Sequence, residues 1–251
     1  MLTNESNCIL SQSCRMAATE SCTKYCEAYV RTKPRVHAAN LPAKYQTTIL
    51  ETSPVREGQL VIYDRLLGTG GQPSYVSTFE RYFDDGRIKS LYLYSESPGT
   101  GKTTTACGIL NAYISAYFAG CIKRGMQIKE RPAFFLDVPE FQGQYNKFNR
   151  RHVPQETAET ASRNYYLMLE HAKQADFLVM DDIGIRDVTA PFLADMHDII
   201  NYRSNREVPT VYTSNIPITE LAHMYGQRLY DRIRDKCVIW TFEGGSHRGN
   251  R

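Results

Sequence analysis

The chain has 251 residues, 42% of them hydrophobic and 23% charged, and its formal net charge is +3. This ordinary composition allows one sizeable core with a small additional module, and so mild a positive excess does not by itself indicate a nucleic-acid ligand. No apolar run approaches the ~18 residues of a membrane span and the N-terminus lacks a secretory signal, so the sequence predicts a cytoplasmic protein with no membrane partner.

The N-terminal segment, residues 1–38, is polar, rich in cysteine and poor in large aliphatic residues. Cytoplasmic thiols stay reduced, so a disulfide framework is not expected. We predict a small metal-bound module with four soft ligands, enough for a closed tetrahedral zinc site: Cys8, Cys14, Cys22 and Cys26. An iron–sulfur cluster on the same four cysteines is a less favoured alternative, and unliganded thiols are a third. His37 could replace one of the cysteines as a ligand.

Residues 39–74 follow as a proline-punctuated linker and N-terminal extension. A third domain is predicted at 75–251, because helical and strand patterns alternate there. Expected strands cover 91–94, 133–138, 176–181, 210–214 and 238–242, and expected helices cover 75–84, 103–118, 139–150, 156–174, 191–205 and 218–235. This alternation predicts an α/β fold with a central, mostly parallel sheet flanked by helices.

The stretch SESPGTGKTT, residues 95–104, lies between an expected strand and an expected helix. In that context glycines let the backbone turn tightly, so that N–H groups and the helix N-terminus face phosphate oxygens. Lys102 is predicted to reach the β- and γ-phosphates of ATP, and Thr103 to hold Mg²⁺. The predicted nucleotide-binding residues of this loop are Pro98, Gly99, Thr100, Gly101, Lys102, Thr103 and Thr104.

One position of this loop departs from the pattern G-x-x-x-x-G-K-[ST]. Glu96 stands five positions before Gly101, where the pattern has glycine. Glutamate resists backbone angles that glycine tolerates, and it brings a carboxylate near a triphosphate. We predict that Glu96 turns outward and that nucleotide binding is retained.

Aromatic and basic residues are interleaved between the strands expected at 133–138 and 176–181. The stretch from Tyr145 to His152 reads YNKFNRRH. Rings that stack on bases and cations that neutralise phosphates suit single-stranded DNA. A solvated helix end accounts for the same pattern equally well.

Polar residues follow two of the apolar strands. Asp181 and Asp182 end the strand FLVM, and Asn215 follows the strand at 210–214. Ligands of open α/β sheets collect at the carboxyl ends of strands, and Mg²⁺ prefers oxygen ligands. We predict that Asp181 acts on Mg²⁺ through its waters, that Asp182 polarises the attacking water, and that Asn215 senses the γ-phosphate. A turn or helix-capping role is the alternative for these side chains.

Together these stretches resemble the AAA+ ATPases, and more narrowly the bacterial and phage helicase loaders of the DnaC/DnaI type. The resemblance rests on LPAKYQTTILE, LYLYSESPGTGKTTTA, FLVMDDIG, PTVYTSN and YGQRLYDRIRDKCVIWTFEGGSHR, and it covers about residues 39–250. It implies a P-loop ATPase domain at 75–251 that uses ATP and Mg²⁺ and assembles with itself. It also implies a hexameric replicative DNA helicase and single-stranded DNA as partners.

The resemblance further implies two arginine roles. In such loaders one arginine reaches into the nucleotide site of a neighbouring subunit, and Arg232 is the matching position, with Arg228 and Arg234 as alternatives. Arg248 matches an arginine that acts from the same subunit as a second nucleotide sensor. DnaI-type loaders also carry a metal-bound N-terminal module that docks on the helicase, which residues 1–38 resemble.

The expected function is therefore an ATP-controlled loader that places the replicative helicase on single-stranded DNA, with slow, assembly-dependent hydrolysis as its switch. One alternative is an IstB-like transposition-targeting ATPase, which would bind duplex DNA and a transposase. Another is an adaptor that binds nucleotide but scarcely hydrolyses it. A DnaA-like initiator is less favoured, because little chain follows Arg248.

Overall fold

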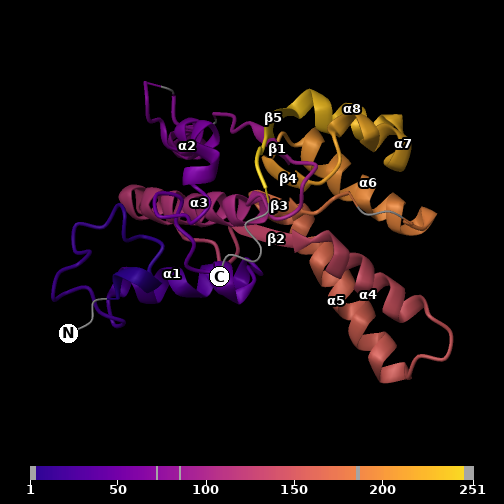
Figure 1. The fold of residues 1–251 in the computed structure, drawn as a ribbon. Coiled ribbons are helices and arrows are strands. Elements are labelled where there is room, and N and C mark those ends of the chain that lie inside the picture. Colours follow the sequence, from indigo (N-terminus) through magenta and orange to yellow (C-terminus); the bar gives the residue numbers. More distant parts are fainter. Residues whose placement is uncertain (1–3, 72, 85, 185–186, 246–251) are drawn as a thin grey trace. The chain divides into compact units, whose positions relative to one another are not determined.

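The structure is a computed structural model that describes residues 4–71, 73–84, 86–184 and 187–245. The chain divides into two compact units. Unit 1 comprises residues 1–88 and 104–134, and unit 2 comprises residues 89–103 and 135–251. Figure 1 labels the helices and strands of both units.

Unit 1 is mainly helical in its described part, and it also includes the first two residues of β2 (Ala133–Asp137). It contains α1 (Glu27–Ala38), α2 (Leu60–Leu67), most of α3 (Lys102–Arg124) and 3₁₀ helices at Glu5–Asn7, Ala43–Tyr45, Glu57–Gln59 and Val76–Asp84. Among the described helices, α3 is long and apolar enough to meet the length and hydropathy of a membrane span. However, 67% of that apolar window is buried within the protein, as in the core helix of a globular unit.

Helix α3 accepts neighbouring side chains at two glycines. A Cβ added to Gly108 would lie 2.7 Å from Leu50 Cδ2, and one added to Gly120 would lie closer still to the ring of Phe83. Leu50 is buried at 2% exposure. Because interiors are close-packed, a side chain at either glycine would displace the group that now fills the space.

A buried hydroxyl network joins α2 to the first turns of α3. The Tyr63 hydroxyl donates to Ser53 Oγ at 2.6 Å and lies 3.1 Å from Thr105 Oγ1. Tyr63 is 1% exposed, so these bonds replace the water that its hydroxyl has lost. The network therefore holds Thr105 of α3 against α2 within unit 1.

The segment 1–38 contributes to the core of unit 1, although the sequence predicts that it needs a cross-link. Helix α1 buries Thr32 and Val36, which lie one turn apart on one face. Upstream of α1, Ser115 Oγ of α3 donates to the Ile9 carbonyl at 3.1 Å. The composition concealed this helix because only one narrow face is apolar and Pro34 lies inside it.

Unit 2 is built on a five-stranded sheet with strand order β2-β3-β4-β1-β5. The strands are β1 (Ser90–Tyr94), β2 (Ala133–Asp137), β3 (Phe177–Asp181), β4 (Thr210–Ser214) and β5 (Cys237–Thr241). Strand β4 pairs in parallel with β3 and with β1, and β1 pairs in parallel with β5. The predicted α/β fold with a central parallel sheet is confirmed.

The helices of unit 2 match the predicted ones with one exception. They are α4 (Val138–Asn149), α5 (Gln155–Gln174), α6 (Ala190–Asn205), α7 (Leu221–Tyr225) and α8 (Gln227–Lys236), with a 3₁₀ helix at Ile218–Glu220. The sequence predicts one helix over 218–235, which is wrong. Gly226 adopts φ 88° and ψ 153°, a conformation open to glycine that ends α7 and begins α8.

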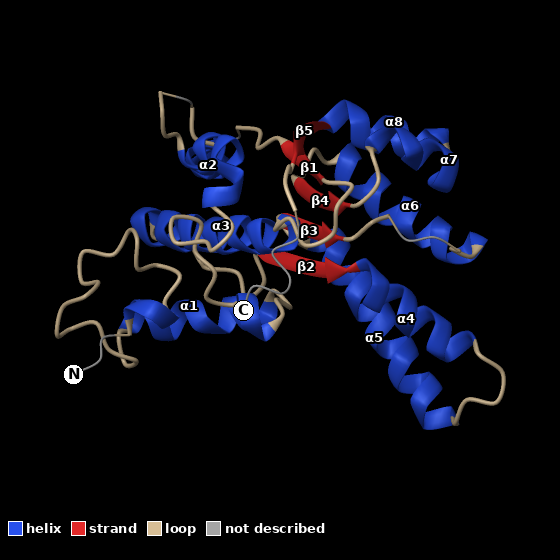
Figure 2. Cartoon of the chain, viewed as in Figure 1, coloured by secondary structure: helices blue, strands red, loops and turns tan. Residues whose placement is uncertain are grey.

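Helices α4 and α5 form an antiparallel pair that extends from the end of β2 (Figure 2). Asp137 caps α4, because its carboxylate accepts the Glu140 N–H at 2.9 Å. Aromatic rings pack between the two helices, with Phe141 stacked on Tyr165 at a centroid distance of 4.3 Å. The pair is therefore held by its own core.

Arg203 of α6 is the largest of the fully buried side chains in the described residues, at 1% exposure. Its guanidinium donates to the carbonyls of Ala175 and Pro209 at 2.6 Å each and to Thr210 Oγ1 at 2.8 Å. A further bond runs to the Ala172 carbonyl at 3.0 Å. One side chain thus ties the end of α5 to the start of β4.

Candidate nucleotide site

The loop after β1 has the backbone that a phosphate-binding loop requires. Gly99 and Gly101 have φ values of 79° and 99°, which side-chain-bearing residues rarely adopt. The loop leads directly into α3, whose first residue is Lys102. Because a helix N-terminus presents unpaired N–H groups, this turn can bind phosphate oxygens.

Lys102 is held inside this loop. Its Nζ donates to the Ser95 carbonyl at 3.2 Å and to the Ser97 carbonyl at 3.1 Å, and the side chain is 7% exposed. Thr100 is fully buried beside it, whereas Pro98 is exposed. The ammonium is therefore already aimed across the turn where phosphates would bind.

Thr103 and Asp181 face each other at the carboxyl edge of the sheet. Thr103 Oγ1 donates to the two carboxylate oxygens of Asp181, at 2.9 and 3.1 Å. On its other side, Asp181 Oδ1 accepts the Thr213 hydroxyl at 2.6 Å. Hydroxyl and carboxylate oxygens are ligands that suit Mg²⁺, which takes only one or two protein groups beside substrate phosphates and water. The pair therefore fits the predicted Mg²⁺ site.

Burial raises the pKa of Asp181 to about 6 from its ordinary 3.8. The hydrogen bonds from Thr213 and Thr103 oppose this rise, and the nearby carboxylates Asp137 and Asp182 add to it. A bound cation would favour the ionised form of this carboxyl group. Binding of a cation would thus lower the pKa of Asp181 again and stabilise its carboxylate form.

Asp182 has a left-handed backbone with φ 57°, uncommon outside glycine but tolerated by aspartate. Its N–H donates to Thr213 Oγ1 at 2.9 Å, and its Oδ1 accepts the Asn215 amide at 3.4 Å. The structure thus brings the side chains of Asp182 and Asn215 together at the ends of β3 and β4. A non-glycine residue in this conformation is often found where function requires a particular side-chain direction.

Thr213 is the residue of this site that sequence reasoning missed. Its hydroxyl donates to Asp181 and accepts from the Asp182 N–H, so one buried atom fixes both acidic residues. The run Thr213-Ser214-Asn215 carries the signal in the sequence, but the prediction used only the amide of Asn215 and not the hydroxyl of Thr213.

Replacing Thr213 with valine should impair Mg²⁺ use more than folding. Valine has the same shape but cannot donate to Asp181, so the pKa of that carboxyl group should rise further. We expect the Mg²⁺ concentration for half-maximal nucleotide binding to increase about tenfold. Thr213→Ser keeps the hydroxyl and should restore the wild-type value. Equal behaviour of the two variants would contradict this role.

Glu96 is exposed, in agreement with the predicted outward orientation. The side chain therefore leaves the inside of the phosphate loop to Lys102 and the backbone. Thr104, the last predicted residue of the loop, lies in the first turn of α3 and is half-buried. The departure from the glycine pattern leaves the other features of the loop intact.

The three candidate arginines lie on α8 with different surroundings. Arg232 is half-buried and donates to Asn205 Oδ1 at 3.1 Å. Arg234 forms ion pairs with Asp231 and Asp235, at 3.2 and 2.8 Å. Arg228 is exposed. Arg248 falls outside the described residues, so its predicted role stays a prediction.

The predicted zinc site is not supported by the structure. The residues that the structure describes contain no group of three or more His, Cys, Asp or Glu side chains that could hold a metal ion. The pKa of the Cys8 thiol is raised, first by burial and then by the nearby thiols of Cys14, Cys22 and Cys26. Each of the four cysteines ends a hydrogen-bonded turn, because its N–H donates to the carbonyl three residues earlier. The iron–sulfur alternative is equally unsupported.

The interleaved stretch at 145–152 divides into two parts. Tyr145 and Phe148 are half-buried and pack on Tyr165, at centroid distances of 5.5 and 5.4 Å, so they are not presented as stacking platforms. The cations are exposed, near or in the turn between α4 and α5: Lys147, Arg150 and Arg151. The aromatic residues of the predicted DNA-binding pattern therefore belong to the packing between α4 and α5.

Comparisons with known proteins show similarity to helicase loaders. No family model matches the chain. The chain is 23% identical over 181 residues to the replicative helicase loader DnaC of Escherichia coli strain K12, covering 71% of this chain and 64% of DnaC. The match thus spans somewhat less than two thirds of that relative's length.

Two solved structures share the fold. The crystal structure of DnaI gives a TM-score of 0.56 at 20% identity, covering 85% of this chain and 100% of that one. AMPPCP-bound DnaA from Aquifex aeolicus gives a TM-score of 0.51 at 19% identity, covering 81% of this chain and 51% of that one. The DnaC match and the fold shared with DnaI confirm that this chain resembles the helicase loaders of the DnaC/DnaI type.

Proposed function

We propose that the chain is an ATP-dependent loader that binds a hexameric replicative DNA helicase and delivers it onto single-stranded DNA. One observation carries the ATP-dependent part: Lys102, Thr103 and Asp181 lie together at the carboxyl edge of a parallel sheet. The similarity to DnaC supports the helicase partner. Such a partner works in the bacterial cytoplasm, which is also where a phage-encoded loader would act.

In this proposal each residue of the site has a defined task. Lys102 exchanges its bonds to two loop carbonyls for bonds to the β- and γ-phosphates, so little reorganisation is needed. Thr103 and, through water, Asp181 would hold Mg²⁺, which would neutralise charge on the phosphates. Asp182 accepts a hydrogen bond from the attacking water, and Asn215 donates its amide toward that water or the γ-phosphate.

Self-association provides the switch. Arg232 would leave Asn205 and reach the nucleotide of the next subunit, so that hydrolysis depends on assembly. Exposed cations near or in the turn between α4 and α5 would contact the DNA backbone. The helicase would dock on unit 1, which includes residues 1–38.

Arg232→Ala is expected to lower ATP turnover of the assembled protein by about 10³-fold, because a trans arginine stabilises charge in the transition state. Arg234→Ala is the matched control and should have a small effect, since Arg234 forms exposed ion pairs on its own helix. A mixing experiment is the sharper measurement. Subunits with Lys102→Ala cannot turn over ATP but should restore turnover to Arg232→Ala subunits. If mixing restores nothing, Arg232 does not act in trans.

The loader function itself is tested by co-purification of the full chain with candidate hexameric helicases. ATP turnover is then measured with and without single-stranded DNA. Capture of a helicase together with DNA-responsive turnover supports the proposal. Capture with flat, near-zero turnover would instead identify a nucleotide-binding adaptor, and absence of capture by every helicase tested would reject the loader.

A further inference from the structure

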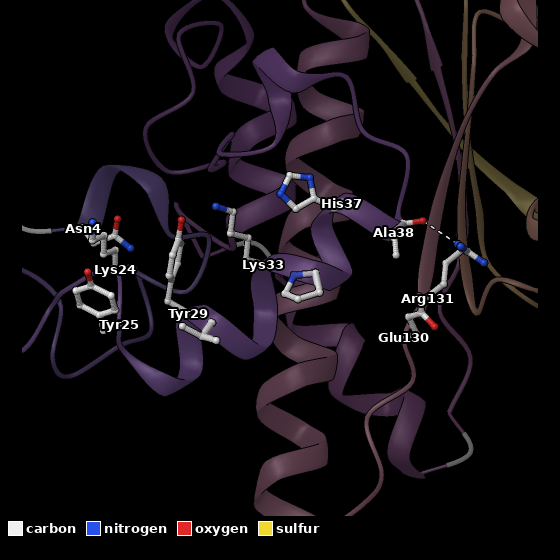
Figure 3. Close-up of a pocket in the computed structure, with 11 residues that line it drawn as sticks. Asn4, Lys24, Tyr25, Tyr29, Lys33, His37, Ala38, Glu130 and Arg131 are labelled. Atoms are coloured by element: carbon white, nitrogen blue, oxygen red, sulfur yellow. Dashed lines mark hydrogen bonds between the residues drawn. The ribbon is translucent and has the colours of Figure 1, made fainter.

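A groove of unit 1 runs along α1, with a volume of about 1010 Å³. One side is formed by α1 and the residues just before it, and the other by the segment that leads into β2 (Figure 3). The lining residues that matter here are Lys24, Tyr25, Tyr29, Lys33, Glu130 and Arg131. None of them belongs to the nucleotide site.

The two sides of this α1 groove are joined by hydrogen bonds. Arg131 Nε donates to the Ala38 carbonyl at 2.8 Å, which Figure 3 marks. Arg35 donates to the carbonyls of Lys129 and Ile128, at 3.1 and 3.2 Å. Charged donors to carbonyls form strong bonds, so the α1 groove is a fixed feature of the surface rather than a gap between loose segments.

The side chains of one wall are regularly spaced. Tyr25, Tyr29, Lys33 and His37 stand four residues apart, and the last three lie within α1. Residues four apart on a helix lie on one face, about 6 Å from each other along the axis. The wall therefore presents rings at one end and cationic or imidazole side chains at the other.

Rings and cations are paired along this wall. Lys24 Nζ lies 5.1 Å from the centre of the Tyr25 ring, and Lys33 Nζ lies 5.8 Å from the centre of the Tyr29 ring. Tyr25 is 78% exposed, an unusual position for so large a ring. Permanent charge in the lining comes from Lys24, Lys33 and Arg131 against the single carboxylate of Glu130. The groove is therefore cationic as well as aromatic.

We propose that the α1 groove binds single-stranded nucleic acid. Bases would stack on the rings of Tyr25 and Tyr29, while Lys24, Lys33 and Arg131 neutralise backbone phosphates. An acidic peptide would use the cations but leave the exposed ring unexplained. A duplex would not offer its base faces to the rings. This contact uses different residues from the cations near the turn between α4 and α5 and requires no ATP, so it goes beyond the proposed function.

The test measures binding of a fluorescein-labelled oligothymidylate to the full chain, without nucleotide or helicase, by fluorescence anisotropy. Lys24→Glu combined with Lys33→Glu should weaken binding at least tenfold and reduce the slope of log K against log salt concentration by about 1.4, since each phosphate contact contributes about 0.7. Lys44→Glu combined with Lys123→Glu changes the charge equally at two exposed sites of unit 1 outside the groove lining. That control should leave the slope nearly unchanged.

The rings are tested separately. Tyr25→Ala should weaken binding about tenfold, whereas Tyr25→Phe keeps the stacking surface and should bind as the wild type does. Equal losses in the two double-lysine variants, or equal binding by the alanine and phenylalanine variants, would overturn the proposal. So would a duplex that competes as well as the single strand, or groove variants that lose only helicase capture. Because no helicase or ATP is present, failure here leaves the loader function untouched.

Discussion

Asp181→Asn should abolish ATP turnover and at the same time make the nucleotide-free protein more stable. Burial holds the pKa of Asp181 near 6 in the folded chain, against 3.8 in the unfolded chain. Between these values the folded state binds more protons, so the contribution of this group to stability falls as pH rises from about 4 to 6. At pH 7 the ionised carboxylate costs about 3 kcal/mol, which asparagine removes.

The measurement is chemical denaturation of both proteins, without Mg²⁺ or nucleotide, at pH 4 and pH 7. The stability gap in favour of the variant should be small at pH 4 and open to about 2–3 kcal/mol at pH 7. Asp182→Asn is the matched control, because Asp182 is half-buried and its left-handed backbone suits asparagine. It should lose turnover as Asp181→Asn does, and a stability gap between Asp181→Asn and the wild type that does not change with pH would contradict the assignment of Asp181.

The wild-type pH profile gives a second check on Asp181. Mg²⁺ binding needs the ionised carboxylate, so Mg²⁺-dependent nucleotide binding should weaken as pH falls through about 6. Contacts between the phosphate loop and phosphate oxygens do not use this carboxylate. Nucleotide binding in the absence of Mg²⁺ should therefore respond less to the same change.

Arg203→Leu should be among the most damaging single substitutions for stability. Leucine leaves the carbonyls of Ala172, Ala175 and Pro209 without the buried donor that now serves them. Each buried polar group that loses its partner costs about 1–3 kcal/mol, so a loss of at least about 3 kcal/mol in the free energy of unfolding is expected. Arg203→Lys keeps the charge but places its donors on one atom, and it should recover only part of the loss.

Urea denaturation measures this loss. Arg206→Leu provides the control, since Arg206 lies three residues further along, is exposed, and contacts the Tyr202 ring at 3.7 Å. Its removal should cost about 1 kcal/mol or less. If the two arginines cost the same, the carbonyl network around Arg203 does not stabilise the fold.

The features that could be predicted from sequence are those set by local pattern. Alternating apolar segments located the strands of the sheet, and glycine spacing located the phosphate loop, because both depend on residues close together in the chain. Asp181 was found because it ends an apolar strand. Thr103 and Asp181 were both assigned to Mg²⁺, and in the structure they are hydrogen-bonded to each other.

The remaining features depend on contacts that the chain makes over long distances. Arg203 is buried because carbonyls from two other segments meet around it, and nothing near it in the sequence signals that meeting. Thr213 acquires its role only when β3 and β4 lie side by side. The pattern around Tyr145 and Phe148 fits both DNA binding and a solvated helix end, because the ring on which they pack, Tyr165, lies on another helix.

Helix α3 begins in unit 2 with Lys102 and Thr103 and continues through unit 1 to Arg124. The first turn therefore belongs to the chemistry of the phosphates, while the remaining turns are held by Tyr63 and by the side chains seated at Gly108 and Gly120. The boundary between the two units therefore falls inside one continuous hydrogen-bonded helix and not in a flexible linker. The turn that carries the phosphate-loop lysine and the turns that pack in unit 1 are parts of a single secondary-structure element.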